Sequence, residues 1–115
     1  MFLAAVAAML KGNLRHKSLS HFIMGSFNIN LPGKGLLIAH LNICSLRNKI
    51  PELCMVMKSN DIHIMAISET HLDASFENIE LAVEGYTLCR KDISRYGGGV
   101  ALYVQNHIPV KVRNY

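Results

Sequence analysis

An apolar run, an amphipathic segment and a second apolar run follow one another in residues 36–67, and this order constrains the fold most. Residues 36–41 and 62–67 are short and mostly apolar, as expected of buried strands. Between them, apolar residues at helical spacing predict a helix over residues 49–59, with Pro51 in its first turn. A strand, a helix and a strand in this order predict a right-handed βαβ unit with parallel strands.

The rest of the chain predicts further strands. Residues 68–84 are polar and are expected to form a loop. Strands are expected over residues 86–91 and 98–105, and the Gly-rich turn between them predicts an antiparallel hairpin. A further strand is expected to begin at residues 110–113. The sequence therefore predicts an α/β (α+β) domain.

Pro and Gly residues near position 33 mark one boundary in the chain. We expect residues 1–35 to be an N-terminal extension, poorly ordered or containing a short helix, and residues 36–115 to form the domain. The extension holds an apolar run at residues 2–10, too short to span a bilayer and followed by basic residues. A targeting segment and a short helix without targeting value are both alternatives for this run.

Composition narrows the class of protein. The chain has 115 residues, of which 50% are hydrophobic and 17% charged, as expected of one small globular domain rather than a disordered tail. The net charge is +4, and no acidic residue precedes Glu52. Three cysteines without a C-x-x-C pair argue against a disulfide framework or a zinc ribbon. We expect an intracellular protein, in the nucleus or cytoplasm, with reduced and mostly buried thiols.

Two polar residues follow the strands of the βαβ unit. Asn42 comes directly after the first strand and Glu69 directly after the second. Parallel neighbouring strands would bring both side chains to one carboxyl edge, where ligand sites form in open α/β sheets. A carboxylate at that edge is a hard oxygen ligand for Mg²⁺. Taken by spacing alone, a solvated loop residue or a helix cap is the simpler interpretation of Glu69.

A small basic cluster and a run of glycines lie further along the chain. Arg90, Lys91 and Arg95 are candidates for contact with a DNA backbone, and a solvated turn is the alternative. Residues 97–99 are all Gly, but no Lys-Ser/Thr pair follows and a strand comes next, so this is not a P-loop. A tight turn that leads into a strand is the preferred interpretation.

Four motifs resemble, in order and spacing, those of the endonuclease/exonuclease/phosphatase superfamily, and most of all those of LINE-type non-LTR retrotransposon endonucleases. The first two are residues 40–49 (HLNICSLRNK) and 67–73 (ISETHLD). The third combines Gly85-Tyr86 with residues 90–92 (RKD), and the fourth is residues 97–104 (GGGVALYV). The second motif departs from its common form, which has Trp where His71 stands.

The resemblance implies a fold, an activity and two roles. The fold is the N-terminal portion of the four-layered α/β-sandwich of this superfamily. The activity is Mg²⁺-dependent (or Mn²⁺-dependent) hydrolysis of a phosphodiester that nicks DNA. Glu69 matches the metal-binding Glu, and Asn42 matches the Asn that helps to place the scissile phosphate. The implied partners are DNA and a reverse transcriptase carried by the same polyprotein, with no membrane.

The resemblance also implies that the fold is incomplete here, because the family's remaining functional residues would align beyond Tyr115. We therefore expect a truncated domain without nuclease activity of its own. Its strands are expected to expose an apolar inner face that favours self-association. The alternatives are a remnant that only binds nucleic acid or a partner, and a phosphatase-type member of the superfamily.

Overall fold

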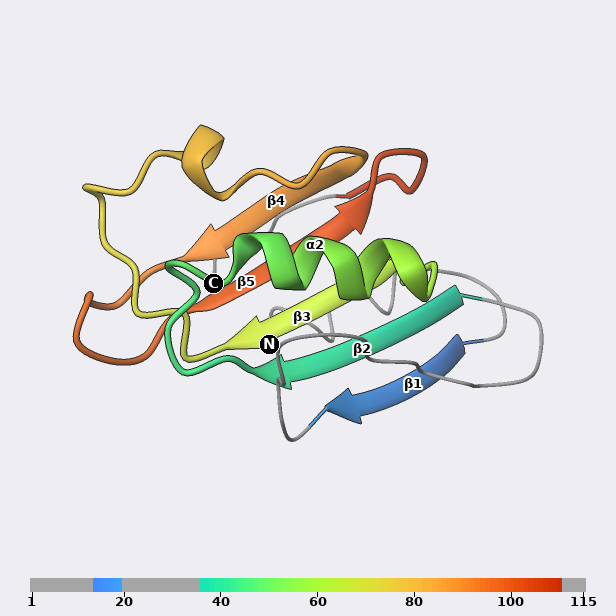
Figure 1. Ribbon diagram of the computed structural model, residues 1–115, viewed down its shortest axis with the longest axis horizontal. Helices are drawn as coiled ribbons and strands as arrows, with labels where there is room; N and C mark the ends of the chain where they lie inside the picture. The colour runs from blue at the N-terminus through green and yellow to red at the C-terminus, as the bar shows by residue number, and fades with distance from the viewer. Residues whose placement is uncertain (1–13, 20–35, 111–115) are drawn as a thin grey trace.

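A mixed β-sheet with one α-helix packed against it forms the body of the protein (Figure 1). The computed structural model describes residues 14–19, by their backbone only, and residues 36–110. The elements are β1 (Leu14–Leu19), β2 (Leu36–Asn42), α2 (Ile50–Ser59), β3 (Ile64–Ser68), a 3₁₀ helix η1 (Asn78–Leu81), β4 (Tyr86–Lys91) and β5 (Val100–Gln105).

The strands are arranged in the order β1-β2-β3-β5-β4. Strands β1, β2 and β3 are parallel to their neighbours, whereas β5 runs antiparallel to both β3 and β4. The predicted βαβ unit is therefore confirmed as β2-α2-β3, and the predicted antiparallel hairpin is confirmed as β4-β5. The small mixed α/β domain is established, and the four-layered sandwich implied by the resemblance stays a prediction.

Helix α2 covers one face of the sheet (Figure 1). It begins one residue later than predicted, with Pro51 in the first turn, where the missing N–H breaks no helical hydrogen bond. Leu53, Val56 and Met57 are its buried residues, and their spacing places them on one side of the helix. They join the core cluster that includes the sheet residue Tyr103.

Alternation along β5 separates two cores. Ala101 and Tyr103 face the α2 side, and Leu102 and Val104 belong to a second cluster on the opposite face. The buried hydroxyl of Tyr103 donates a 2.6 Å hydrogen bond to the carbonyl of Leu81. This bond ties η1 to the centre of the sheet on the α2 side.

The second face of the sheet differs from the expectation. A cluster of six apolar residues on this face is at most 6% exposed, with Ile64 and Val104 fully buried, and Leu36, Cys89 and Val110 pack against it partly buried. The predicted exposed apolar face is therefore wrong for these residues. Self-association through the sheet stays a prediction.

The predicted N-terminal extension contributes a strand to the sheet. Residues 14–19 form β1, which pairs with β2 in a register that joins Leu14 to Leu36 and Leu19 to Leu41. The sequence LRHKSL has neither strict alternation nor a continuous apolar run, so the pattern gave no sign of this strand. The apolar run at residues 2–10 and the start of a strand at residues 111–113 lie outside the described residues, and Val110 itself is not in a strand.

Candidate functional site

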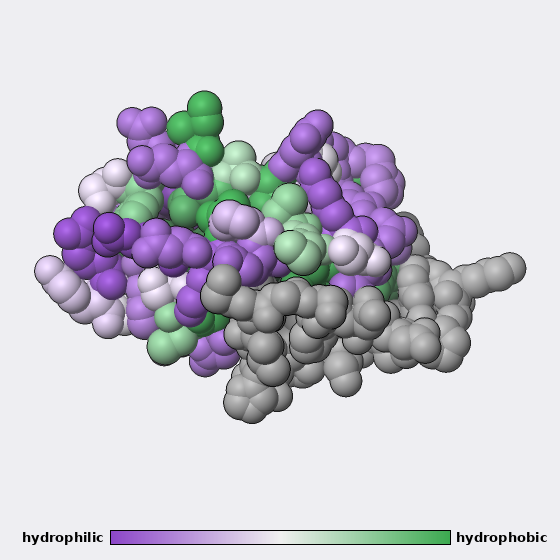
Figure 2. Space-filling view, in the orientation of Figure 1, coloured by the Kyte–Doolittle hydropathy of each residue, from purple (hydrophilic) through white to green (hydrophobic). Residues whose placement is uncertain are grey.

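Three chain segments meet at the carboxyl edge of β2 and β3, at the left of Figure 1. Asn42, the last residue of β2, is paired in register with Ser68, the last residue of β3. Ser68 is paired in turn with Val100, the first residue of β5. Asn42 at the end of β2 and Glu69 directly after β3 therefore lie at one edge of the sheet, as predicted. The turn that contains Gly97, Gly98 and Gly99, called the glycine turn below, lies at the same edge. Hydrophilic residues dominate this end of the surface (Figure 2).

The loop after β2 runs alongside the segment after β3. The N–H of Ser45 donates to the carbonyl of Glu69 at 2.8 Å, and the N–H of Leu46 donates to that of Thr70 at 2.9 Å. The ammonium group of Lys49 donates to the carbonyl of Ile43 at 2.7 Å and holds the loop in its curve. These bonds continue the pairing of β2 and β3 beyond the regular strands.

The glycine turn lies on the other side of the same segment. The N–H of His71 donates to the carbonyl of Gly98 at 3.0 Å, and the N–H of Thr70 donates to that of Gly99 at 3.4 Å. Thr70 is fully buried, and a Cβ added to Gly99 would collide with its Oγ1. Residues 69–71 are therefore fixed from both sides, and Gly99 is required by close packing.

The carboxylate of Glu69 is oriented by the backbone. Its Oε2 accepts a 2.6 Å hydrogen bond from the N–H of Gly98 and lies 3.7 Å from Nε2 of His71. The side chain is 43% exposed, and its other oxygen has no hydrogen-bond partner among the described residues. A half-exposed carboxylate with one oriented and one open oxygen suits a hard cation such as Mg²⁺.

The backbone at this edge adopts an uncommon conformation. Glu69 and His71 have φ angles of 57° and 55°, and Cys44 and Ser45 in the neighbouring loop have 51° and 93°. Left-handed φ values are uncommon outside glycine and cost about 1–3 kcal/mol each, and they cluster at functional sites. With Asn48, whose φ is 66°, the two adjoining loops hold five such residues, which supports a functional role for this edge.

Asn42 presents a polar side chain at the same edge. It is exposed, and its amide forms no hydrogen bond with another described residue. The amide is therefore available to a ligand. In the ranges that the structure describes, no group of three or more His, Cys, Asp or Glu side chains lies together as a metal site. A Mg²⁺ ion at this edge would therefore have few protein ligands, which is compatible with its chemistry because this ion retains several waters.

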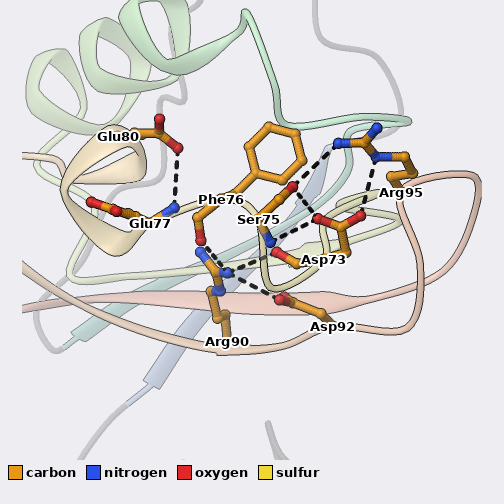
Figure 3. A network of polar contacts seen from close by, with 8 residues as sticks. All are labelled: Asp73, Ser75, Phe76, Glu77, Glu80, Arg90, Asp92 and Arg95. Atoms are coloured by element: carbon orange, nitrogen blue, oxygen red, sulfur yellow. Dashed lines mark hydrogen bonds and ion pairs between the residues drawn. The ribbon is translucent and has the colours of Figure 1, made fainter.

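The predicted basic cluster separates into different environments. Arg90 is 13% exposed and pairs with Asp92 at 3.0 Å, and its guanidinium donates to the carbonyls of Phe76 and Asp73 at 2.5 and 3.1 Å (Figure 3). Arg90 therefore holds the loop after β3 from inside. This placement does not support the predicted contact of Arg90 with DNA.

Arg95 and Lys91 face the solvent. Arg95 pairs with Asp73 at 3.1 Å and donates to Oγ of Ser75 at 3.2 Å (Figure 3). The hydroxyl and N–H of Ser75, followed by the charge of Arg95, lower the pKa of Asp73. Lys91 is exposed and forms no ion pair with another described residue. Both cations remain candidates for contact with DNA.

Sequence reasoning missed two features of this edge. Gly98 was interpreted only as part of a turn, although its N–H orients the proposed metal ligand. Phe76 was assigned to a polar loop, although its ring lies 6.0 Å from the guanidinium carbon of Arg47 and 5.9 Å from that of Arg95. A lone aromatic residue in a polar stretch was the available signal for Phe76.

Neither a protein-family model nor a curated protein matches the chain. An assignment to a family is therefore a proposal, for which the motifs and the placement of residues at this edge are the support. Among the described residues, the helices are too short and too polar to cross a membrane.

Proposed function

We propose that the chain carries part of the active site of a Mg²⁺-dependent DNA endonuclease of the retrotransposon type. In this proposal Glu69 is a metal ligand and Asn42 places the scissile phosphate. The main support is the pairing of Asn42, at the end of β2, with Ser68, the last residue of the adjacent parallel strand and the one directly before Glu69. The hydrogen bond from Gly98 to Glu69 adds support, because metal-binding carboxylates are commonly oriented by a second hydrogen-bond partner.

The proposed reaction is hydrolysis of a phosphodiester by in-line attack of water, with the 3′ oxygen as the leaving group. A bound Mg²⁺ would stabilise charge on the transferring phosphoryl group. The side chains of the protein would bind the cation and orient the phosphate. Glu69 would hold the cation through its carboxylate, whose direction Gly98 fixes, and the amide N–H of Asn42 would donate to a non-bridging phosphate oxygen.

A binding function without catalysis is the second candidate. It needs no metal site, and within residues 36–110 no cluster of three metal-ligating side chains occurs. The solvent-facing cations Arg95 and Lys91 would serve such a protein equally well. A phosphatase of the same superfamily would use the same edge on a phosphomonoester, and no described contact favours it over a nuclease.

Binding of Mn²⁺ to the ¹⁵N-labelled chain tests the proposed metal ligand directly. Substoichiometric Mn²⁺ is expected to broaden the amide signals of Gly98 and Thr70, and E69Q is expected to abolish this broadening. E84Q is the control, because that side chain is 95% exposed and lies away from the carboxyl edge. Equal broadening in the wild type and E69Q would refute the assignment of Glu69.

A supercoiled-plasmid assay with Mg²⁺ then separates the two candidate functions. We expect the chain by itself to bind metal at Glu69 without nicking the plasmid, as a partial site would. Nicking that E69Q abolishes would show that the chain is catalytically sufficient. DNA binding without any metal binding at Glu69 would favour the non-catalytic candidate.

A further inference from the structure

A groove with a volume of about 390 Å³ lies beside the Glu69 edge. Its lining includes Arg47 and Asn48 from the loop after β2, Ser75 and Phe76 from the loop after β3, and Arg95 from the turn before β5. The first of these loops follows Asn42 directly, and the other two segments also carry Glu69 and Gly98. We call it the Phe76 groove.

An aromatic ring with two cations near it is the main feature of the Phe76 groove. The guanidinium carbons of Arg47 and Arg95 lie 6.0 and 5.9 Å from the centroid of the half-buried Phe76 ring. Both distances fall within the cation–π range of about 6 Å. The groove therefore combines a flat apolar surface with positive charge.

The two arginines differ in whether their guanidinium groups already have a partner. Arg95 is already paired with Asp73 and Ser75, so its guanidinium serves mainly as a fixed wall of the groove (Figure 3). Arg47 is exposed, and none of the described carboxylates forms an ion pair with it. Arg47 is therefore the cation that a bound anion would meet.

The floor of the groove is held in place before any ligand binds. Arg90 fixes the carbonyl of Phe76 at 2.5 Å from the inner side. The helix η1 begins two residues later with a capping box, in which the N–H of Glu77 donates to the carboxylate of Glu80 at 3.0 Å (Figure 3). That bond directs the carboxylate of Glu80, the acidic residue of the lining, toward the N-terminal end of η1. A preorganised site lowers the entropic cost of binding.

We propose that the Phe76 groove binds one nucleotide of a single DNA strand, with its base stacked on Phe76 and its phosphate on Arg47. Bases stack on aromatic side chains and on arginine planes, and arginines bind phosphate oxygens. The volume lies in the range of about 300–1,000 Å³ that is typical of small-ligand sites. An acidic peptide would satisfy Arg47 and leave the ring unused. The choice of DNA as the polymer rests on the proposed function.

Fluorescence anisotropy with a short thymidine strand and its abasic counterpart tests the groove. In EDTA, F76A is expected to weaken binding of the thymidine strand by about fivefold or more while leaving the abasic strand unaffected. R47Q is expected to weaken both strands and to reduce the salt dependence by about 0.7 in logarithmic slope. The charge-matched control is K58Q, since Lys58 lies on α2 outside this groove.

Three results would overturn the proposal. The first is an affinity for the thymidine strand that is the same in R47Q and the wild type. The second is a loss of affinity in F76A that is equal for the thymidine and the abasic strand. The third is displacement of the thymidine strand by polyglutamate at equal charge concentration. Because Phe76 packs against the core, its truncation to Ala also removes core contacts. F76L therefore serves as a second variant, which retains apolar volume but lacks the aromatic ring. Amide spectra establish that each variant is folded. Strand binding is measured in EDTA, where no cation can occupy the proposed metal site, so failure of the metal site and failure of the groove are distinguishable.

Discussion

The backbone N–H of Gly98 donates a 2.6 Å hydrogen bond to Oε2 of Glu69, which precedes it by 29 residues. The bond joins the segment after β3 to the turn before β5. Gly98 has a φ of +74°, a conformation that residues with a Cβ rarely adopt. The position of the proposed metal ligand therefore depends on a glycine in the neighbouring loop.

Substitution of Gly98 by Ala is expected to reduce both stability and metal affinity. The left-handed backbone costs a residue with a Cβ about 1–2 kcal/mol. The added Cβ would also lie 2.8 Å from Cδ1 of Ile93, an exposed side chain that can move. Urea unfolding and Mn²⁺ titration are the measurements. The matched control is G85A, where φ is +89° and no atom lies within 4 Å of the added Cβ.

Comparison of the two variants isolates the role of the Glu69 contact. Both are expected to lose stability from backbone strain, and only G98A is expected to bind Mn²⁺ more weakly. Equal Mn²⁺ affinity in G98A and G85A would show that the Gly98 hydrogen bond does not orient the carboxylate.

Loss of the Arg90 guanidinium is expected to destabilise the protein strongly. R90M would leave Asp92, whose side chain is 19% exposed, without its partner, and would free the carbonyls of Asp73 and Phe76. Breaking a buried pair from one side costs about 3–5 kcal/mol. Chemical denaturation measures the loss, and K91Q on the adjacent exposed residue is expected to change stability by less than about 0.5 kcal/mol. Similar effects of R90M and K91Q would place Arg90 in solvent.

Local patterns predicted the elements of this fold better than the contacts between them. Helix α2 and strands β2 to β5 follow from apolar periodicity, and the parallel pairing places Asn42 and Glu69 at one edge. Strand β1 was missed because an edge strand gains its hydrogen bonds from a neighbour and needs no apolar pattern. The internal role of Arg90 depends on carbonyls 14 and 17 residues away, which no local pattern encodes.

Acid is expected to remove the contribution of Asp73 to stability. Bonds from Ser75 and the charge of Arg95 lower the pKa of Asp73 below its ordinary value of 3.8. Because the folded state favours the ionised carboxyl, the stabilisation is present above pH 3.8 and is lost as the pH falls through the folded pKa. D73N is therefore expected to melt below the wild type at neutral pH and to converge with it in acid. Thermal melts from neutral pH into acid measure the difference in melting temperature between D73N and the wild type. A difference that does not change with pH would contradict the prediction.

Thiol alkylation gives a direct readout of the site edge. The sequence led us to expect mostly buried thiols, but Cys44 is exposed in the loop that follows Asn42. Cys89 is partly buried, and burial raises the pKa of its thiol, which reduces the reactive thiolate at mildly alkaline pH. We therefore expect iodoacetamide to modify Cys44 before Cys89, as measured by mass spectrometry of the digested protein over time.

Bound DNA is expected to change the relative alkylation rates of Cys44 and Cys89 if the strand passes along the carboxyl edge of β2 and β3. The thymidine strand is expected to slow alkylation of Cys44 and to leave the rate at Cys89 unchanged, because Cys89 belongs to the core cluster on the opposite face of the sheet. The effect should disappear in R47Q, which retains both cysteines but loses the cation proposed to hold the phosphate. Protection of Cys44 that persists in R47Q would show that the strand reaches this edge without using the Phe76 groove.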